Sequence, residues 1–347
     1  MSRNVPCVIR GGCSHWPAVT KWTPKYLAQL AGQLTVSVEA TPDGRGQRVG
    51  GQTMSSAHSA LPPTPPPPTG DAIATDSDGQ RVFVLPESQR WRFADFLSLM
   101  EARGSPSTCP TNHDRPGVFY LSHQNGNLLA ADEFGQVLAA SGDIELEHAF
   151  AREALGAAPD AVNFWMGRHD AVTTLHKDPY DNIYSVIAGT KIFTIFPPSD
   201  AVFLTEELLP VRQYEQSVAD GSFKVCGWWG RGRRWRCGSS PLPLLQMVPY
   251  VDGTGESLRP WLANDPVQPD FDQHPRQQHA HPYTVRVEAG DVLYLPALWY
   301  HHVQQEGEPC IAVNTWCVRY AAHVRLAHDL LLPLHHPFPQ GTTWPTT

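Results

Sequence analysis

Short runs of apolar residues, with alternation in several of them, dominate the second half of the chain. From Val162 onward they are VNFWM, NIYSVIAG leading into TKIFTIF, YTVRV, DVLYL, YHHVQQ and CIAVNTW, separated by turns that contain Gly, Pro and Asp. β-Branched and aromatic residues fill these runs, and such residues favour strands. Many short strands at close spacing are typical of a sandwich or barrel. We therefore expect a jelly roll with helices outside it, in which NIYSVIAG and TKIFTIF form a hairpin.

The first third of the chain alternates between strand-like and helix-like patterns. CVIRGG predicts a short strand, and a helix is expected to begin near Thr23 and Pro24, because threonine caps helices and proline suits their first turn. Trp16 and Trp22 are expected in the core. Residues 90–104 have apolar side chains at helical spacing and end at a glycine, which predicts a second helix. Residues 117–123 then predict a strand.

Two segments have a composition unlike the rest of the chain. Residues 44–70 are rich in Pro, Gly and Ser, which predicts a disordered loop or, as the alternative, a polyproline ligand for a partner. Residues 226–245 contain four arginines and three tryptophans without any strand or helix period. They are either a basic arm that binds nucleic acid or substrate, or the product of a retained intron. We expect an N-terminal region (1–115), a β domain (116–320) and a C-terminal helix and tail (321–347).

Composition and charge narrow the class of protein. The chain has 347 residues, 41% of them hydrophobic, and a formal net charge of -8, which is enough for a large core but gives no basic footprint for nucleic acid. There is neither an apolar run long enough to span a membrane nor a signal-peptide pattern, so we expect no membrane contact and a cytoplasmic or also nuclear location. Seven scattered cysteines without a C-x-x-C pair predict reduced thiols.

A histidine and an aspartate lie two residues apart at the start of the most strongly patterned β segment. Alternate residues of a strand face the same side, so His176 and Asp178 can direct an imidazole nitrogen and a carboxylate to one point. A third ligand is expected from the run YHHVQQ, where either His301 or His302 faces inward. Two histidines and one carboxylate are the ligand set of non-heme Fe(II) oxygenases.

A lysine follows this pair in the next β segment. Lys191 is expected on a strand beside the ligand strand, facing into the barrel. A buried lysine needs an anion. A dicarboxylate whose other end chelates iron would supply one, so Lys191 predicts an acidic co-substrate.

Several motifs together resemble those of the jumonji C (JmjC) oxygenases of the small hydroxylase type. They are VNFWMG, TTLHKDPYDN, AGTKIFTIFPPSD, GDVLYLPALWYHHVQQ and CIAVNTW, in the family's order between Val162 and Trp316, and IRGGCSHWPAVTKW resembles the family's N-terminal region. The resemblance implies a double-stranded β-helix, the cupin-like jelly roll, that uses Fe(II), 2-oxoglutarate and dioxygen. It covers most of the chain outside the two unusual segments.

The resemblance also implies roles for individual residues. It makes His176, Asp178 and His301 the catalytic iron ligands, with His302 pointing away, and Lys191 the partner of the 2-oxoglutarate 5-carboxylate. The further residues implied for the co-substrate pocket are Thr173, Tyr120, Asn182 and Asn314. Strict strand alternation from His176 would favour Thr174 instead of Thr173. Trp316 matches an aromatic position of the family, whereas Thr315 replaces its usual phenylalanine.

The activity implied by the resemblance is hydroxylation of a lysine at its β-carbon in a protein substrate, with GTPases as the family's substrates. The alternatives are demethylation of histone methyl-lysine, endopeptidase action on methylated histone tails, and an inactive peptide-binding module. Asp181 and Glu288 are candidates for holding the substrate lysine, but both also fit turn positions. The apolar run VRLAHDLLLPL predicts a C-terminal helix that packs on the barrel or forms a homodimer, as in the family.

Overall fold

The structure, a computed structural model, is built from two β-sheets with helices gathered at one end. It describes residues 4–42, 74–76, 78–101, 117–123, 128–129, 133–156, 158–226, 250–251 and 257–317. The larger sheet has ten strands, with the path β1-β15-β9-β16-β7-β6-β2-β5, while β14 pairs with β9 and β8 with β16. Its strands are β1 (Cys7–Ile9), β2 (Thr35–Thr41), β5 (Glu87–Arg92), β6 (Val118–His123), β7 (Ala161–Gly167), β8 (Thr173–Lys177), β9 (Asp181–Phe196), β14 (Tyr283–Glu288), β15 (Val292–Leu295) and β16 (Tyr300–Cys317).

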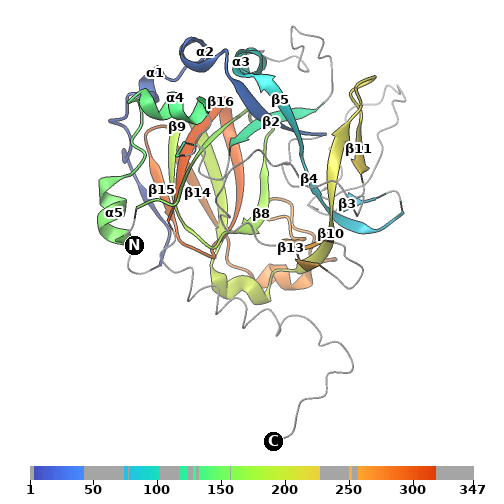
Figure 1. Cartoon of the computed structure of the whole chain (residues 1–347). Coiled ribbons are helices and arrows are strands. Elements are labelled where there is room, and N and C mark those ends of the chain that lie inside the picture. Colours follow the sequence, from blue (N-terminus) through green and yellow to red (C-terminus); the bar gives the residue numbers. More distant parts are fainter. Residues whose placement is uncertain are drawn as a thin grey trace, which may run out of the picture.

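The helices cover the larger sheet and form the main core with it. Figure 1 shows α2, α3 and α4 together at one end of the molecule, with the strands β9 and β16 beside them. The largest apolar cluster joins side chains of these helices, such as Leu27, Phe96 and Leu138, to sheet residues such as Phe164 and Val313. The helical segments are α1 (Ala18–Lys21), α2 (Pro24–Ala31), α3 (Phe93–Glu101), α4 (Glu133–Ala140), α5 (Ala149–Leu155) and the 3₁₀ turns η1 (Pro198–Val202) and η2 (Pro275–His279).

The two longest strands, β9 and β16, pair with each other at the centre of the larger sheet, and here the predicted hairpin is wrong. Residues 181–196 form one continuous strand that pairs with β15 and then with β14 on one edge and with β16 on the other. Hydrogen-bonding partners are therefore available on both sides of Gly189, so the chain bends there and does not turn back. Gly189 has φ 71°, and a Cβ at this position would collide with the carbonyl oxygen of Glu306.

A second, smaller sheet was not anticipated from the sequence. Its six strands are β3 (Ala74–Thr75), β4 (Arg81–Leu85), β10 (Glu206–Gln216), β11 (Phe223–Cys226), β12 (Tyr250–Val251) and β13 (Ser257–Leu262). These strands come from segments separated by long stretches of sequence, and their central pair, β10 and β4, is parallel. In Figure 1 the small sheet stands beside β8, with β13 close to it. This sheet forms one wall next to the candidate metal ligands described below.

Several predictions for the N-terminal part are confirmed, and one helix boundary is wrong. The Thr23 side chain caps α2 by accepting the Tyr26 backbone N–H at 3.2 Å, and Trp16 and Trp22 are buried. The helix predicted for residues 90–104 begins only at Phe93. Residues 90–92 pair with β2 as the end of β5, because the edge of β2 offers a ladder of backbone partners there.

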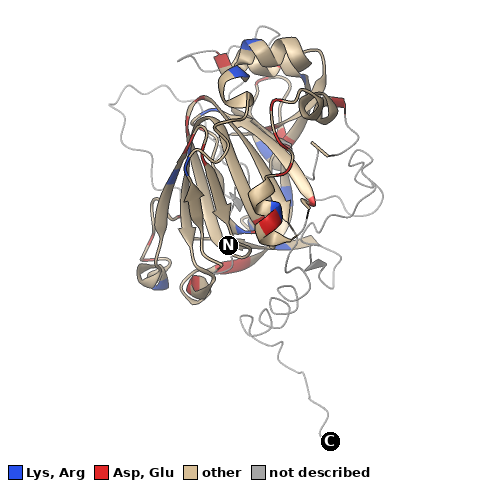
Figure 2. Cartoon of the chain, turned by 90° about the vertical axis from the view of Figure 1, so that its left-hand side faces the viewer, with Lys and Arg blue, Asp and Glu red and all other residues tan. Residues whose placement is uncertain are grey.

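The described cysteines are all free thiols. Cys13, Cys310 and Cys317 are buried, and burial raises the pKa of the Cys13 and Cys317 thiols to about 12. None of the described helices is long and apolar enough to cross a membrane. In Figure 2 most of the barrel ribbon is tan, the colour of uncharged residues, and both acidic and basic residues occur among the described elements.

Some predictions fall outside the described residues. They concern the Pro-rich segment 44–70, the arginine-rich segment beyond Cys226, the C-terminal helix and its homodimer contact, and two of the seven cysteines, Cys109 and Cys237.

A buried histidine in the core generates a prediction about stability. The His148 ring stacks on Trp16 with 4.7 Å between ring centroids, and its Nε2 lies 2.8 Å from the Ser185 hydroxyl. Burial lowers the pKa of His148 to about 4. Because the unfolded chain binds the proton more readily, the free energy of unfolding should fall by about 2 kcal/mol between pH 7 and pH 5 through this residue. Urea unfolding at the two pH values measures this free energy, and in His148→Gln its fall between pH 7 and pH 5 should be smaller by about 2 kcal/mol. An equal fall in the wild type and the variant would contradict the lowered pKa of His148.

Candidate metal centre

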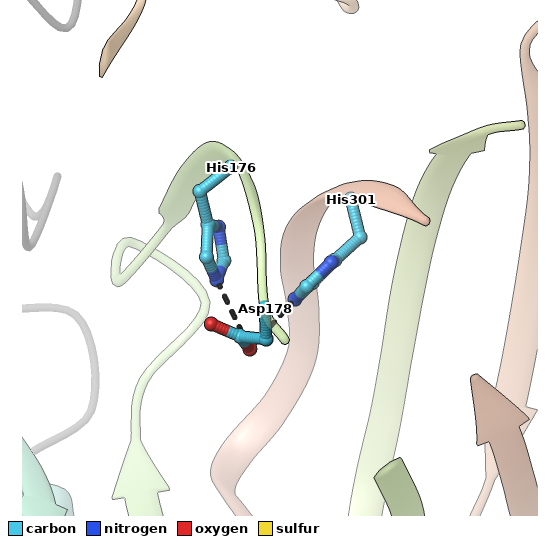
Figure 3. A group of neighbouring side chains, drawn as sticks. All are labelled: His176, Asp178 and His301. Carbon is cyan, nitrogen blue, oxygen red and sulfur yellow. Dashed lines mark ion pairs between the residues drawn. The ribbon is translucent and has the colours of Figure 1, made fainter. Parts of the chain in front are cut away.

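Two histidines are brought together by strand pairing at the mouth of the barrel. His176 on β8 is the direct antiparallel partner of His301 on β16. Asp178 follows β8 in a turn that is fixed by a hydrogen bond from the Leu298 backbone N–H to the Asp178 carbonyl oxygen, 2.8 Å. Figure 3 shows the two imidazole rings directed at the Asp178 carboxylate. Backbone pairing thus places all three predicted ligands in one cluster.

The hydrogen bonds of the two imidazoles use Nδ1 and leave Nε2 free to bind a cation. His176 Nδ1 lies 2.8 Å from the Thr174 carbonyl oxygen, and His301 Nδ1 lies 3.0 Å from the Trp299 carbonyl oxygen. A carbonyl oxygen only accepts, so each Nδ1 carries the proton and donates it. The lone pair of each neutral imidazole is therefore on Nε2, on the side that faces Asp178.

The distances fit a shared cation and are too long for direct hydrogen bonds. Asp178 Oδ2 lies 3.7 Å from His176 Nε2 and 3.6 Å from His301 Nε2, and one ligand atom from each of the three residues falls within 4.8 Å of the others. Burial, together with the neighbouring His176, lowers the pKa of His301 to about 4, so this imidazole is neutral at pH 7 as ligation requires. Two neutral imidazoles and one carboxylate suit Fe(II).

A tryptophan of the small sheet holds His176 from the side. The indole of Trp261 on β13 stacks on the His176 ring with 5.8 Å between centroids and an interplanar angle of 6°. Trp261 is buried and also contacts the Phe83 ring at 4.7 Å. Sequence reasoning missed Trp261, because no local pattern indicates that a residue 85 positions away in the chain packs on His176.

Lys191 lies inside the barrel, next to the strand that carries His301. It is the cross-strand partner of Gln305, and its Nζ donates a hydrogen bond to the Gln305 side-chain oxygen. Gln305 in turn donates to the Arg168 carbonyl oxygen at 2.5 Å. Burial lowers the pKa of Lys191, and no carboxylate among the described residues pairs with it. The ammonium group is thus available to an anion that enters the barrel.

Tyr120 on β6 lies close to Gly167, as does the Gln305 side chain that accepts the Lys191 hydrogen bond. A Cβ placed at Gly167 would lie 3.3 Å from the Tyr120 Cβ and 2.8 Å from Gln305 Nε2, so the glycine leaves room where these two side chains meet. Burial also raises the pKa of Tyr120 well above its ordinary value, so its hydroxyl keeps its proton.

A bulge in β8 decides which threonine shares a face with His176. Thr173 pairs with Val303 and His176 with His301, so three residue steps on β8 match two on β16. Val303 and His301 are two apart and share a face, and so do their partners Thr173 and His176. Strict alternation, which favoured Thr174, fails because of this extra residue. His302, between the two on β16, faces the other way and is buried.

Asn182 and Asn314 belong to a buried amide network. Asn314 Nδ2 donates to Asn182 Oδ1 at 3.0 Å, and Asn314 Oδ1 accepts from Asn163 Nδ2 at 3.1 Å and from Trp165 Nε1 at 2.6 Å. The sequence did not single out Asn163 and Trp165 as individual residues, although their alternation within VNFWM places them on one face of β7. The network fixes both predicted asparagines in the barrel.

The two residues considered for holding the substrate lysine, Asp181 and Glu288, do not lie in the metal-ligand cluster. Asp181 is buried at the start of β9 and accepts from the Tyr294 hydroxyl at 3.0 Å and from the Ala297 backbone N–H at 3.3 Å, which gives it a structural role. Glu288 is exposed at the end of β14. The Trp316 ring stacks on the ring of Tyr180 at 5.0 Å, and Thr315 is buried between strands.

The comparisons with known proteins identify the family. A family model described as a cupin-like domain matches residues 1–319. The chain belongs to the cupin-like JmjC oxygenases and is a 2-oxoglutarate-dependent dioxygenase. The family implies Fe(II) and 2-oxoglutarate as its metal and co-substrate.

Three relatives are similar over most of their length. The human protein named bifunctional peptidase and (3S)-lysyl hydroxylase JMJD7 is 36% identical over 313 residues, which are 90% of this chain and 77% of the relative. JmjC domain-containing protein E of Dictyostelium discoideum is 30% identical, over 91% of this chain and 78% of the relative. Lysine-specific demethylase JMJ32 of Arabidopsis thaliana is 30% identical, over 91% and 76%.

The geometry predicts a different outcome for the two adjacent histidines of β16. His301→Gln should weaken Mn(II) binding by at least about 100-fold, because one ligand of three is lost, whereas His302→Gln should change it by less than about threefold. Isothermal titration calorimetry on both variants, after circular dichroism has shown that each is folded, measures this. Equal losses in both variants would contradict the assignment of His301 as the ligand.

Proposed function

We propose that this protein hydroxylates a lysine of a protein substrate at its β-carbon, using Fe(II), 2-oxoglutarate and dioxygen, with succinate and CO2 as co-products. The observation that carries the proposal is the convergence of His176 Nε2, His301 Nε2 and the Asp178 carboxylate in a barrel that also contains Lys191, a buried lysine without a carboxylate partner among the described residues. The name of the human relative supports lysyl hydroxylation as the outcome.

In this proposal His176, Asp178 and His301 hold the iron. When bound, the metal with its co-substrate supplies the oxidising chemistry that breaks an unactivated C–H bond. The carbonyl groups of Thr174 and Trp299 keep the two imidazoles in the tautomer that can bind a cation. The stacking of Trp261 on His176 limits rotation of that ring. Three protein ligands leave coordination positions for the co-substrate and dioxygen.

Lys191 binds the far carboxylate of 2-oxoglutarate. The ammonium lies in a low-dielectric interior, where a charge-assisted hydrogen bond to a carboxylate is strong. In this proposal Thr173 and Tyr120 donate further hydrogen bonds to that carboxylate. Thr173 shares a face with His176, and the Tyr120 phenol stays protonated, which supports the assignment. The Asn182 and Asn314 amides line the same pocket in this proposal. Gln305 accepts from Lys191 and keeps the ammonium in position before the co-substrate enters.

The substrate class is a lysine-containing protein segment, and we propose a GTPase-type protein as its source. The second candidate function is demethylation of methyl-lysine in a histone tail, because one relative is named a lysine-specific demethylase. Both reactions use the same site on different carbon atoms. Hydroxylation leaves the oxygen on the substrate, whereas oxidation of an N-methyl group releases formaldehyde.

Removal of the Lys191 charge should separate co-substrate binding from metal binding. Lys191→Met should weaken 2-oxoglutarate binding by about 100-fold, because a buried carboxylate loses its charged partner, while Mn(II) affinity changes by less than about threefold. Calorimetric titration of each ligand measures the two effects. Lys224→Met, which removes an exposed lysine of β11, is the matched control. Unchanged 2-oxoglutarate affinity in Lys191→Met would contradict the role of this residue.

The reaction itself is tested by product analysis. Wild-type protein with Fe(II) should convert 2-oxoglutarate to succinate, and Asp178→Ala should lose this activity by at least about 1000-fold. With substrate, mass spectrometry should find a stable gain of one oxygen on lysine and no formaldehyde. Formaldehyde at a yield equal to succinate would select the demethylase, and cleaved peptide would select the peptidase. Succinate without any change in lysine-containing proteins would refute the lysyl substrate.

A further inference from the structure

A second cation lies next to the candidate metal ligands and has no acidic hydrogen-bond partner among the residues that the structure describes. Arg259 is on β13, two residues before Trp261, so both side chains project from the same face of the strand. The Arg259 guanidinium carbon lies 5.1 Å from the centroid of the Phe83 ring and 5.9 Å from that of Trp261. Because Trp261 stacks on His176, this arrangement fixes the guanidinium near the ligand cluster.

The hydrogen-bonding capacity of Arg259 is not used by the part of the chain that the structure describes. Its Nε is buried without an acceptor, and no ion pair of Arg259 occurs among the described residues. Burial lowers the pKa of Arg259, and the nearby Asp178 carboxylate opposes this effect. Aromatic faces stabilise a guanidinium, but they do not replace the acceptors that its N–H groups lose on burial.

Asp178 cannot neutralise Arg259 once the metal site is filled. Its Oδ2 is directed at His176 Nε2 and His301 Nε2, and a divalent cation bound there outweighs the single negative charge of the carboxylate. A 2-oxoglutarate dianion would then be balanced by the metal centre and by Lys191. Among the groups that the structure describes, the Arg259 charge is then left over, and an anion from outside the chain would complete the balance.

We propose that Arg259 is a specificity-determining residue that binds the carboxylate of an acidic side chain on the protein substrate, close to the residue that is oxidised. This inference rests on the proposed function only in requiring a protein substrate. A guanidinium presents a planar fork of donors that matches a carboxylate with two parallel hydrogen bonds. A lysine ammonium would be repelled by Arg259, so the target lysine must enter with its charged end directed elsewhere.

An alternative role would be purely internal, with Arg259 acting on the metal through Asp178. The two roles have different signatures. A residue that acts through Asp178 affects metal affinity and 2-oxoglutarate turnover for every substrate alike. A residue that binds a substrate carboxylate affects only the discrimination between acidic and neutral substrates.

The test compares two sets of fluorescein-labelled short peptides with a central lysine and neutral flanks. One set carries a glutamate at each flanking position in turn, and the other carries a glutamine at the same position. Dissociation constants are measured by fluorescence anisotropy with Mn(II)-loaded protein, and succinate formation is measured separately with Fe(II). The proteins are wild type, Arg259→Gln, Arg259→Lys and Arg152→Gln. The last removes an exposed arginine of α5, which Figure 1 shows on the other side of the molecule from β13.

Wild-type protein should bind the best glutamate peptide about tenfold more tightly than its glutamine twin, the effect of one charge-assisted interaction. Arg259→Gln should reduce this ratio to about one, Arg259→Lys should give an intermediate ratio, and Arg152→Gln should keep the wild-type ratio. Peptide-free succinate formation and Mn(II) affinity should stay within about twofold of wild type in Arg259→Gln. A wild-type ratio near one at every position, or a ratio that survives in Arg259→Gln, overturns the proposal. Failure of wild-type protein to form succinate would instead count against the proposed function, because the binding ratio is read without turnover.

Discussion

The register between β16 and its neighbours is the constraint on which the site depends. This strand places His301 opposite His176 on β8 and Gln305 opposite Lys191 on β9. Side chains alternate along a strand, so a slip of one residue would turn His301 away and present His302 in its place. The metal cluster and the lysine pocket are therefore set by the same backbone ladder. The bend of β9 at Gly189 and the matching irregularity after Glu306 are what allow two long strands to keep this register around the barrel.

Two cations without an acidic hydrogen-bond partner among the described residues are a second feature of the interior. Lys191 and Arg259 both lie where burial disfavours their charged forms, and each lacks an acidic hydrogen-bond partner among the described residues. Such groups destabilise a folded protein unless an anion arrives. In our proposals, a dianionic co-substrate satisfies Lys191 and an acidic substrate side chain satisfies Arg259. Ligand binding should therefore also stabilise the fold, since the anions bind only the native arrangement.

Local sequence was sufficient for some of these features and insufficient for others. Most strands of the larger sheet after Val162, the capped helix at Thr23 and the approach of His176 to Asp178 follow from short-range pattern. The position of Thr173 on the ligand face does not, because it depends on a bulge that only the pairing of β8 with β16 creates. The predicted hairpin failed at Gly189 for a related reason, since a glycine can mark a bend as well as a turn when partner strands lie on both sides.

The small sheet shows the limit of local reasoning most clearly. Phe83, Arg259 and Trp261 come from segments far apart in the chain and meet through parallel and antiparallel pairing around β10. No periodicity within either segment indicates that they meet. Asn163 and Trp165 were visible as alternating residues, but only the amide network with Asn314 gives them a role.

The central claim is that a divalent iron held by His176, Asp178 and His301 binds a 2-oxoglutarate whose far carboxylate reaches Lys191. The most direct measurement is an anaerobic titration of Fe(II)-loaded protein with 2-oxoglutarate, followed by visible absorption. Chelation of Fe(II) by a 2-oxo acid produces a charge-transfer band, and the account predicts that this band appears at stoichiometric co-substrate in wild-type protein and requires about 100-fold more co-substrate in Lys191→Met. A folded, iron-loaded wild-type protein that develops no band would contradict the account.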